Sequence, residues 1–297
     1  MEMKYCIYCR QPLSVDTETS HHESCYNEVM TYNTNAFRRF VADYVEENGL
    51  KYWKYECYVK FDQEGNATSI DLSRSKSIPE SISELTELRI LILTDCNLTN
   101  LPKNIKNLRK LKKLILKDNK LSIIESLCHL ESLEFLSVRN NHISRLPEEI
   151  SRLTNLRVLI LDDNSIVELP ISIGCLRQLE VLSLISNEID SLPNELFDVT
   201  TLKVLALSNN RIERISESLS ELNNLEVLFI EGNRLTELPE TIGMLGRLRV
   251  LNLAGNQLVR LPDSICSLNP DCKMSFSSNK LSSIPDCLSN FRRCYGL

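Results

Sequence analysis

A chain of 297 residues is long enough for one extended domain or two compact ones with a sizeable core. Its formal net charge of −6 disfavours a general nucleic-acid or anionic-membrane binder. No apolar run approaches the roughly 18 residues of a membrane span, and the first residues lack the basic-then-apolar layout of a secretory signal. We therefore expect a cytoplasmic protein with no membrane span and no nucleic-acid partner.

The chain begins with a pattern of cysteines and histidines in MEMKYCIYCRQPLSVDTETSHHESCY. Two cysteines stand three residues apart, and a histidine and a cysteine with the same separation would point the same way at the start of a helix. Together they form a tetrahedral Cys₃His set that suits structural zinc: Cys6, Cys9, His22 and Cys25. His21 is the alternative to His22. The segment resembles small treble-clef or zinc-ribbon fingers of the form CxxC…HxxC, so we predict a zinc-finger-like domain over residues 1–30 with one Zn²⁺ per chain.

Residues 31–66 are predicted to form a capping helix and a hairpin. In TNAFRRFVADYVEENG the apolar side chains recur at helical spacing, and Asn48-Gly49 ends the pattern. In WKYECYVKFDQEGNATSIDLS alternation on both sides of DQEGN predicts a β-hairpin whose second strand begins a sheet. We expect the helix to pack on the hairpin; a helix exposed for partner binding is the alternative.

Residues 67–297 repeat one pattern every 23 residues, with one step of 22. LRILILTDCNLTNLP and LEVLFIEGNRLTELP are two of about nine copies, which a degenerate first repeat precedes and a C-terminal cap follows. Leucines that alternate with variable residues predict a strand with one buried face. The apolar interval of three in the LPxxIxxL tail predicts a short 3₁₀ turn.

One asparagine recurs at the same position of each copy, where its amide can bond the backbone of the adjoining turn. The position is filled by Asn119, Asn141, Asn164, Asn187, Asn210, Asn233, Asn256 and Asn279. Cys96 takes this place in the first full repeat.

The pattern resembles LxxLxLxxNxLxxLPxxIxxL, the signature of leucine-rich repeats. The resemblance implies an α/β solenoid, a horseshoe with a concave parallel sheet inside and narrower turns outside. The 23-residue LP-containing class is similar to intracellular scaffolds that engage Ras-type GTPases, and to prokaryotic and archaeal leucine-rich repeat proteins. A small GTPase is thus the partner that the resemblance implies.

Function on such a scaffold depends on the variable strand positions rather than on the leucines. Apolar side chains there have no structural reason to face water, and such patches usually mark protein contacts. Neutral drift on a tolerant surface is the alternative. The predicted partner-binding residues are Ile92, Ile115, Lys117, Arg139, Ile160, Asp162, Ile185, Phe229 and Glu231.

Four cysteines fall singly in separate repeats, where a reducing cytosol would leave them as small buried hydrophobes: Cys96, Cys128, Cys175 and Cys266. A disulfide among Cys272, Cys287 and Cys294 stays open at this point.

We predict a non-enzymatic scaffold that binds a protein through the concave face. The alternative is the recognition arm of a ubiquitin-ligase-like or thiol-based effector. Such an enzyme needs a nucleophile beside a base, and outside the zinc candidates only His129 and His142 could supply the base.

Overall fold

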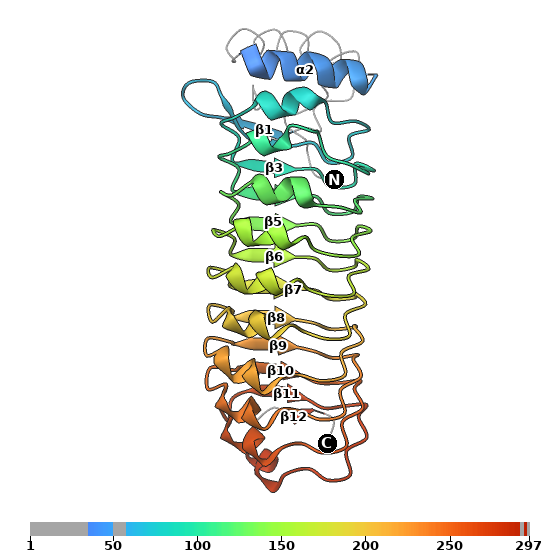
Figure 1. The fold of residues 1–297 in the computed structure, drawn as a ribbon, viewed down its shortest axis with the longest axis vertical. Coiled ribbons are helices and arrows are strands. Elements are labelled where there is room, and N and C mark those ends of the chain that lie inside the picture. The colour runs from blue at the N-terminus through green and yellow to red at the C-terminus, as the bar shows by residue number, and fades with distance from the viewer. Residues whose placement is uncertain (1–34, 50–57, 292–293, 296–297) are drawn as a thin grey trace, which may run out of the picture. The chain divides into compact units, whose positions relative to one another are not determined.

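The computed structural model describes residues 35–49, 58–291 and 294–295 (Figure 1). The five candidate zinc ligands all precede residue 35, so the predicted zinc finger lies outside the described residues. The chain divides into two compact units between Lys120 and Leu121. The part before this division is called the first unit below, and the part after it the second unit.

The first unit contains the predicted helix and hairpin. Helix α2 (Asn35–Glu47) is followed by the antiparallel strands β1 (Tyr58–Phe61) and β2 (Ala67–Asp71). Two parallel strands and two short 3₁₀ helices complete the unit: β3 (Ile90–Ile92), β4 (Lys113–Ile115), η1 (Glu80–Glu84) and η2 (Ile105–Asn107).

Helix α2 buries the apolar side chains that its sequence spacing singled out. Phe37 and Phe40 are fully buried, and the ring of Phe37 meets that of Phe61 edge-on, with 4.9 Å between centroids. Asn48, predicted only as a stop signal, also bonds the first repeat: its Oδ1 accepts from the backbone N–H groups of Lys76 (2.8 Å) and Ser77 (3.0 Å). The helix is thereby tied to the chain that follows the hairpin.

The second unit is a stack of repeats whose strands pair in sequence order. All its strand pairs are parallel. The strands are β5 (Phe135–Ser137), β6 (Val158–Ile160), β7 (Val181–Ser183), β8 (Val204–Ala206), β9 (Val227–Phe229), β10 (Val250–Asn252), β11 (Lys273–Ser275) and β12 (Cys294–Tyr295). The 3₁₀ helices are η3 (Glu125–His129), η4 (Glu148–Arg152), η5 (Ile171–Cys175), η6 (Asn194–Asp198), η7 (Glu217–Glu221), η8 (Glu240–Met244), η9 (Asp263–Ser267) and η10 (Asp286–Asn290).

Burial alternates along β6, β9 and β10, as the sequence predicted, whereas in β5, β7 and β8 the small third residue is buried as well. In the repeat that contains β6, Leu159 and Leu161 are fully buried, whereas Val158 and Ile160 on the other face stay partly exposed. The tail of the same repeat adds Ile173 and Leu176 to the core from η5 and the residue that follows it. Each repeat therefore contributes one strand and one turn to a shared leucine core.

The recurring asparagines join consecutive repeats through their side-chain amides. Asn164 Nδ2 donates to the carbonyl oxygens of Val138 (3.1 Å) and Leu161 (2.9 Å), and its Oδ1 accepts from the N–H of Ile143 (3.0 Å). Asn187 makes the same three bonds one repeat later. The amides satisfy backbone groups that leave the sheet and would otherwise be unpaired, as predicted.

The residue before each asparagine of the series, and before Cys96, has a positive φ, which the sequence reasoning did not predict. Asp163, for example, has a φ of 54°, and Gly232 has a φ of 67°. This left-handed conformation favours Gly, Asn and Asp, whose short side chains tolerate it. The position is filled by Asp95, Asp118, Asn140, Asp163, Ser186, Asn209, Gly232, Gly255 and Ser278.

Replacing one asparagine of this series should destabilise the second unit strongly. Asn187→Ala removes three hydrogen bonds in the buried interior, so we expect the free energy of unfolding to fall by about 3 kcal/mol. Urea denaturation followed by circular dichroism measures the change. Asn194→Ala is the control, because Asn194 is exposed on η6 and should cost little. Equal losses in the two variants would contradict the structural role of the series.

Candidate functional site

The strands of the second unit present one face to the leucine core and another to solvent; the second is called the solvent face below. Its first row runs across five neighbouring strands that pair in register. The row consists of Ile160, Ser183, Ala206, Phe229 and Asn252. A second row lies two residues after the first in each repeat and consists of Asp162, Ile185, Ser208, Glu231 and Ala254.

The solvent face carries a few large apolar side chains with small side chains between them. Ile160, Ile185 and Phe229 are all partly exposed. Between Ile160 and Phe229 in the first row lie two small residues, Ser183 and Ala206, of which Ala206 on β8 is 3% exposed. Small side chains flanked by large ones leave a shallow apolar surface that a partner side chain can contact.

Two of the charged residues predicted for partner binding are bonded within the second unit. Asp162 is 8% exposed, and its Oδ1 accepts from Ser183 Oγ (2.5 Å) and from the N–H of Ile185 (3.0 Å). Arg139 is exposed, and its Nε donates to Asp163 Oδ2 (2.9 Å). The Asp162 carboxylate therefore contributes to joining β6 and β7, which the sequence did not predict.

Glu231 differs from Asp162 in having a buried oxygen that is not paired. Its Oε2 and the Oγ of Ser208 are both buried, and neither has a hydrogen-bond partner among the described residues. Ser208 itself is only 1% exposed. The sequence reasoning predicted Glu231 as a contact residue but not Ser208. The signal that could have indicated Ser208 is that it is a second small residue on the same face, two positions after Ala206.

The first unit has its own partly exposed apolar pair. Ile92 on β3 and Ile115 on β4 pair in register on the face opposite to the buried leucines. Lys117, two residues beyond Ile115, places its Nζ 3.3 Å from Asp118 Oδ2. The three predicted contact residues of this unit therefore lie on one side of its two parallel strands.

Opposite charges alternate at the starts of successive strands of the second unit, which the sequence reasoning also missed. Glu180 lies between Arg157 (2.7 Å) and Lys203 (2.6 Å). The hydrogen bond from Lys203, aided by Arg157, holds the pKa of the Glu180 carboxyl below its ordinary value. Exposed pairs of this kind add little stability each, but they prevent like charges from facing one another.

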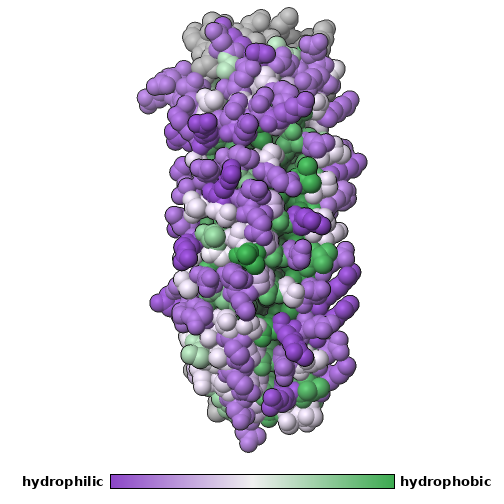
Figure 2. Space-filling view, in the orientation of Figure 1, coloured by the Kyte–Doolittle hydropathy of each residue, from purple (hydrophilic) through white to green (hydrophobic). Residues whose placement is uncertain are grey.

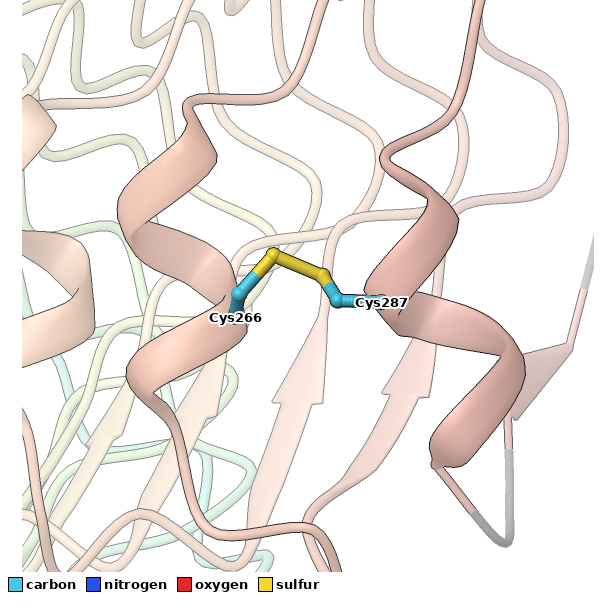
Figure 3. The surroundings of a disulfide bond; sticks show 2 residues. All are labelled: Cys266 and Cys287. Atoms are coloured by element: carbon cyan, nitrogen blue, oxygen red, sulfur yellow. A yellow bond between two sulfur atoms is a disulfide. The ribbon is translucent and has the colours of Figure 1, made fainter.

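Two of the four cysteines expected to be buried differ from that expectation. Cys96 and Cys128 are buried, and loss of solvent raises the pKa of both thiols, that of Cys128 to about 12. Cys175 is instead exposed on η5. Cys266 is also exposed, and it forms a disulfide with Cys287 (Figure 3).

The Cys266–Cys287 disulfide joins η9 to η10, with 5.8 Å between the Cα atoms. Cys266 directly follows a buried isoleucine, and Cys287 is the second residue after the proline of the next repeat. Residues at these two positions approach closely in other repeats as well. Gly243 and Ser264 occupy the same two positions one repeat earlier, and a Cβ added to Gly243 would collide with the carbonyl oxygen of Ser264. Cys272, one of the three residues left open for a disulfide, is buried.

No group of three or more His, Cys, Asp or Glu side chains within the described part of the chain is placed to hold a metal ion. His129 lies on η3, and His142 follows Asn141 outside the strands. In the same part of the chain no helix combines the length and the hydrophobicity that crossing a bilayer requires.

A groove of about 430 Å³ lies on another part of the second unit, between two successive proline turns. It is lined by Arg145, Leu146, Pro147, Glu148, Glu168, Leu169, Pro170 and Ile171. Hydrophilic residues cover most of the surface visible in Figure 2, and hydrophobic residues form only small separate patches there. None of the residues that line the groove belongs to the two rows of the solvent face, so the groove and the solvent face are two distinct candidates for contact.

Comparison with known protein families identifies the repeats. Residues 117–235 match the model described as leucine-rich repeat region, and residues 86–143 and 247–268 match two further leucine-rich repeat models. These segments are leucine-rich repeats. The search of curated proteins found no match to the chain.

Solved structures with the same fold come from several organisms. A leucine-rich repeat protein of Leptospira interrogans is 36% identical with a TM-score of 0.71, over 74% of this chain and 57% of its own. The ectodomain of the Arabidopsis thaliana receptor kinase GASSHO1/SCHENGEN3, in complex with CASPARIAN STRIP INTEGRITY FACTOR 2, is 30% identical with a TM-score of 0.68, over 76% of this chain and 29% of its own. An internalin of Listeria monocytogenes, at 24% identity, TM-score 0.60 and coverage of 77% and 61%, shows the fold alone. The chain thus spans little more than half of the Leptospira protein.

Thiol labelling of the native protein should separate the cysteines by burial. N-ethylmaleimide should modify Cys175 rapidly and Cys128 only after unfolding, because a buried thiol with a raised pKa supplies almost no thiolate. Peptide mass spectrometry after timed quenching measures each site. Labelling of Cys128 as fast as that of Cys175 would contradict the burial described above.

Proposed function

We propose that this chain is a non-enzymatic protein-interaction module whose partner docks on the solvent face of the second unit, around Ile160, Ile185 and Phe229. Leucine-rich repeats generally mediate protein–protein interaction, and this chain contains them over most of the second unit. The similar receptor ectodomain from Arabidopsis thaliana was solved with a protein ligand bound. These comparisons support the class of function, and the contact residues are our inference from the surface.

One observation carries the proposal: the apolar side chains on the solvent face are not needed for the core. The core is complete on the opposite face, where the strand leucines are buried. Beside the first row runs a register of partly exposed valines that extends the apolar surface across the strands. It consists of Val158, Val181, Val204, Val227 and Val250. Contiguous apolar surface of this kind is typical of contact sites.

The first unit offers Ile92, Ile115 and Lys117 as further contact residues. They lie on the face of its strands that is not packed on the leucines. We propose that they contact protein as well, and their contribution can be measured separately through variants in this unit. A small GTPase as partner remains a prediction that the resemblance of the repeats alone supports.

The enzymatic alternative finds less support in the described residues. A thiol-based or ubiquitin-ligase-like effector needs a reactive nucleophile beside a base. The exposed thiol of Cys175 lies on a 3₁₀ helix, apart from the strands that carry the solvent face. The cytoplasmic location also stays a prediction, and it conflicts with a stable Cys266–Cys287 disulfide, since disulfides persist mainly in oxidising compartments.

Charge introduced into the apolar surface should weaken partner binding strongly without unfolding the chain. Peptides selected from a phage library of random dodecapeptides serve as the probe, and fluorescence anisotropy measures their affinity. We expect Ile160→Asp and Phe229→Asp to weaken binding by roughly tenfold or more, because each desolvates a carboxylate in the interface. Ile171→Asp is the matched control, since Ile171 is 62% exposed at the start of η5.

The control also tests the competing site. Loss of binding in Ile171→Asp alone would transfer the contact to the groove between the proline turns, which Ile171 lines. Equal affinity in all three variants would refute docking on the solvent face. Circular dichroism and thermal unfolding confirm that each variant is folded.

We also propose, from the sequence, that Cys6, Cys9, His22 and Cys25 hold one structural Zn²⁺, with His21 as the alternative ligand. Such an ion would stabilise a segment too short to form a core of its own. Metal analysis of the purified chain should give one zinc per chain, and Cys9→Ser should remove most of it. Cys175→Ser is the control and should retain zinc. A metal-free wild-type protein after expression in zinc-supplemented medium would refute the site.

A further inference from the structure

We infer that Ser208 and Glu231 form a subsite for a basic side chain of the partner, beside Phe229. The docking segment would then be a stretch of protein that presents a lysine or arginine next to an apolar residue. This inference rests on the proposed function and specifies the chemistry of its partner.

The two residues are neighbours on adjacent chain segments of the second unit. Ala206 and Phe229 pair in register at the ends of β8 and β9. Backbone bonds continue the pairing beyond them, since the N–H of Leu207 donates to the Phe229 carbonyl (2.7 Å) and that of Asn209 to the Glu231 carbonyl (2.8 Å). Ser208 lies between these two bonds, next to Glu231 on the same face.

Both side chains carry a buried polar atom that lacks a hydrogen-bond partner among the described residues. These atoms are Ser208 Oγ, on a residue that is 1% exposed, and Glu231 Oε2. A buried hydroxyl or carboxylate oxygen that has lost water without gaining a bond destabilises the free protein. Native structures keep few such atoms, and a ligand that bonds them would remove the penalty.

The chemistry of the two oxygens selects a donor with positive charge. An ionised carboxylate only accepts hydrogen bonds, and a serine hydroxyl can accept them as well. Lysine and arginine side chains carry only donors, so one such group can serve both oxygens. An acidic or phosphorylated ligand would instead be repelled by Glu231.

The nearby carboxylates Asp162 and Asp163 are already bonded within the second unit, so Glu231 is the carboxylate that we expect to accept a hydrogen bond from a partner. Asp162 bonds Ser183 and the backbone of Ile185, and Asp163 is paired with Arg139. The second unit as a whole carries more Asp and Glu than Lys and Arg. A basic ligand is therefore attracted to the unit and finds an unpaired carboxylate oxygen on its solvent face.

Phe229 provides the apolar half of the subsite. It precedes Glu231 by two residues on the same chain segment, so both side chains belong to the solvent face. The aliphatic stem of a lysine, or the flat guanidinium of an arginine, packs favourably against an aromatic ring. An apolar residue beside the basic one can contact the rest of the apolar surface, towards Ile185.

The test uses the peptides selected on the wild-type protein from the random dodecapeptide library. We expect them to be enriched in a lysine or arginine adjacent to an apolar residue. Glu231→Gln should weaken their binding by roughly tenfold or more, because a charge-assisted hydrogen bond is lost. Glu237→Gln, which removes the same charge from an exposed position of the same repeat, should leave the affinity unchanged.

A double-mutant cycle identifies the contact itself. Replacing the basic residue of a selected peptide with glutamine should weaken binding to the wild-type protein but cause little further loss on Glu231→Gln, because the two groups interact. Ser208→Ala should give a smaller loss of affinity. Neither variant should unfold at a lower temperature than the wild-type protein, since Ser208→Ala removes an unpaired buried hydroxyl and Glu231→Gln neutralises a carboxylate that has an unpaired buried oxygen.

The outcomes distinguish this inference from the proposed function. Peptides without a basic residue, or with equal affinity for the wild-type protein and Glu231→Gln, would overturn the subsite. If Phe229→Asp still abolished their binding, docking on the solvent face would stand. If no selected peptide depended on either Glu231 or Phe229, or none were enriched, both proposals would fail.

Discussion

The asparagine amides between consecutive repeats are the interaction on which the rest of each unit depends. Asn164 bonds a carbonyl of its own turn, a carbonyl of the preceding repeat and an N–H of the preceding repeat, and Asn187 and Asn210 do the same. Strands of three residues are too short to fix their own register by ladder hydrogen bonds alone. The amides hold the strand ends at matching positions, so that residues such as Ile160, Ala206 and Phe229 fall into rows.

This arrangement separates the residues that stabilise the repeat from those that can recognise a partner. Leucines and asparagines occupy the buried positions, and a change there costs stability. The outward positions can vary because the core does not use them, as the series Ile160, Ser183, Ala206 and Phe229 shows. Unpaired atoms at Ser208 and Glu231 fit the same division, since a binding site often keeps polar groups that are unfavourable in the free protein.

Local periodicity made much of this fold predictable from the sequence. The three-residue interval of the tail and the recurring asparagine depend on neighbours in the chain, and both predictions are confirmed. Alternation within the strands holds for β6 and β9 but not at Ser137, Ser183 and Ala206, which are buried although they lie on the solvent face. The bonding of Asp162 to Ser183, the burial of Ser208 and the Cys266–Cys287 disulfide were not predicted. Each depends on which side chains of two consecutive repeats meet, and single-repeat spacing does not contain that information.

The central claim, that a partner docks on the solvent face of the second unit, is tested most directly by site-specific photo-crosslinking. A benzophenone amino acid would be placed at Phe229 and, in a second variant, at Met244, which is 65% exposed on η8. The account predicts crosslinks to a bound peptide from position 229 and none from position 244. Crosslinks from position 244 alone would contradict it, because the contact would then lie on the 3₁₀ helices instead of the strands.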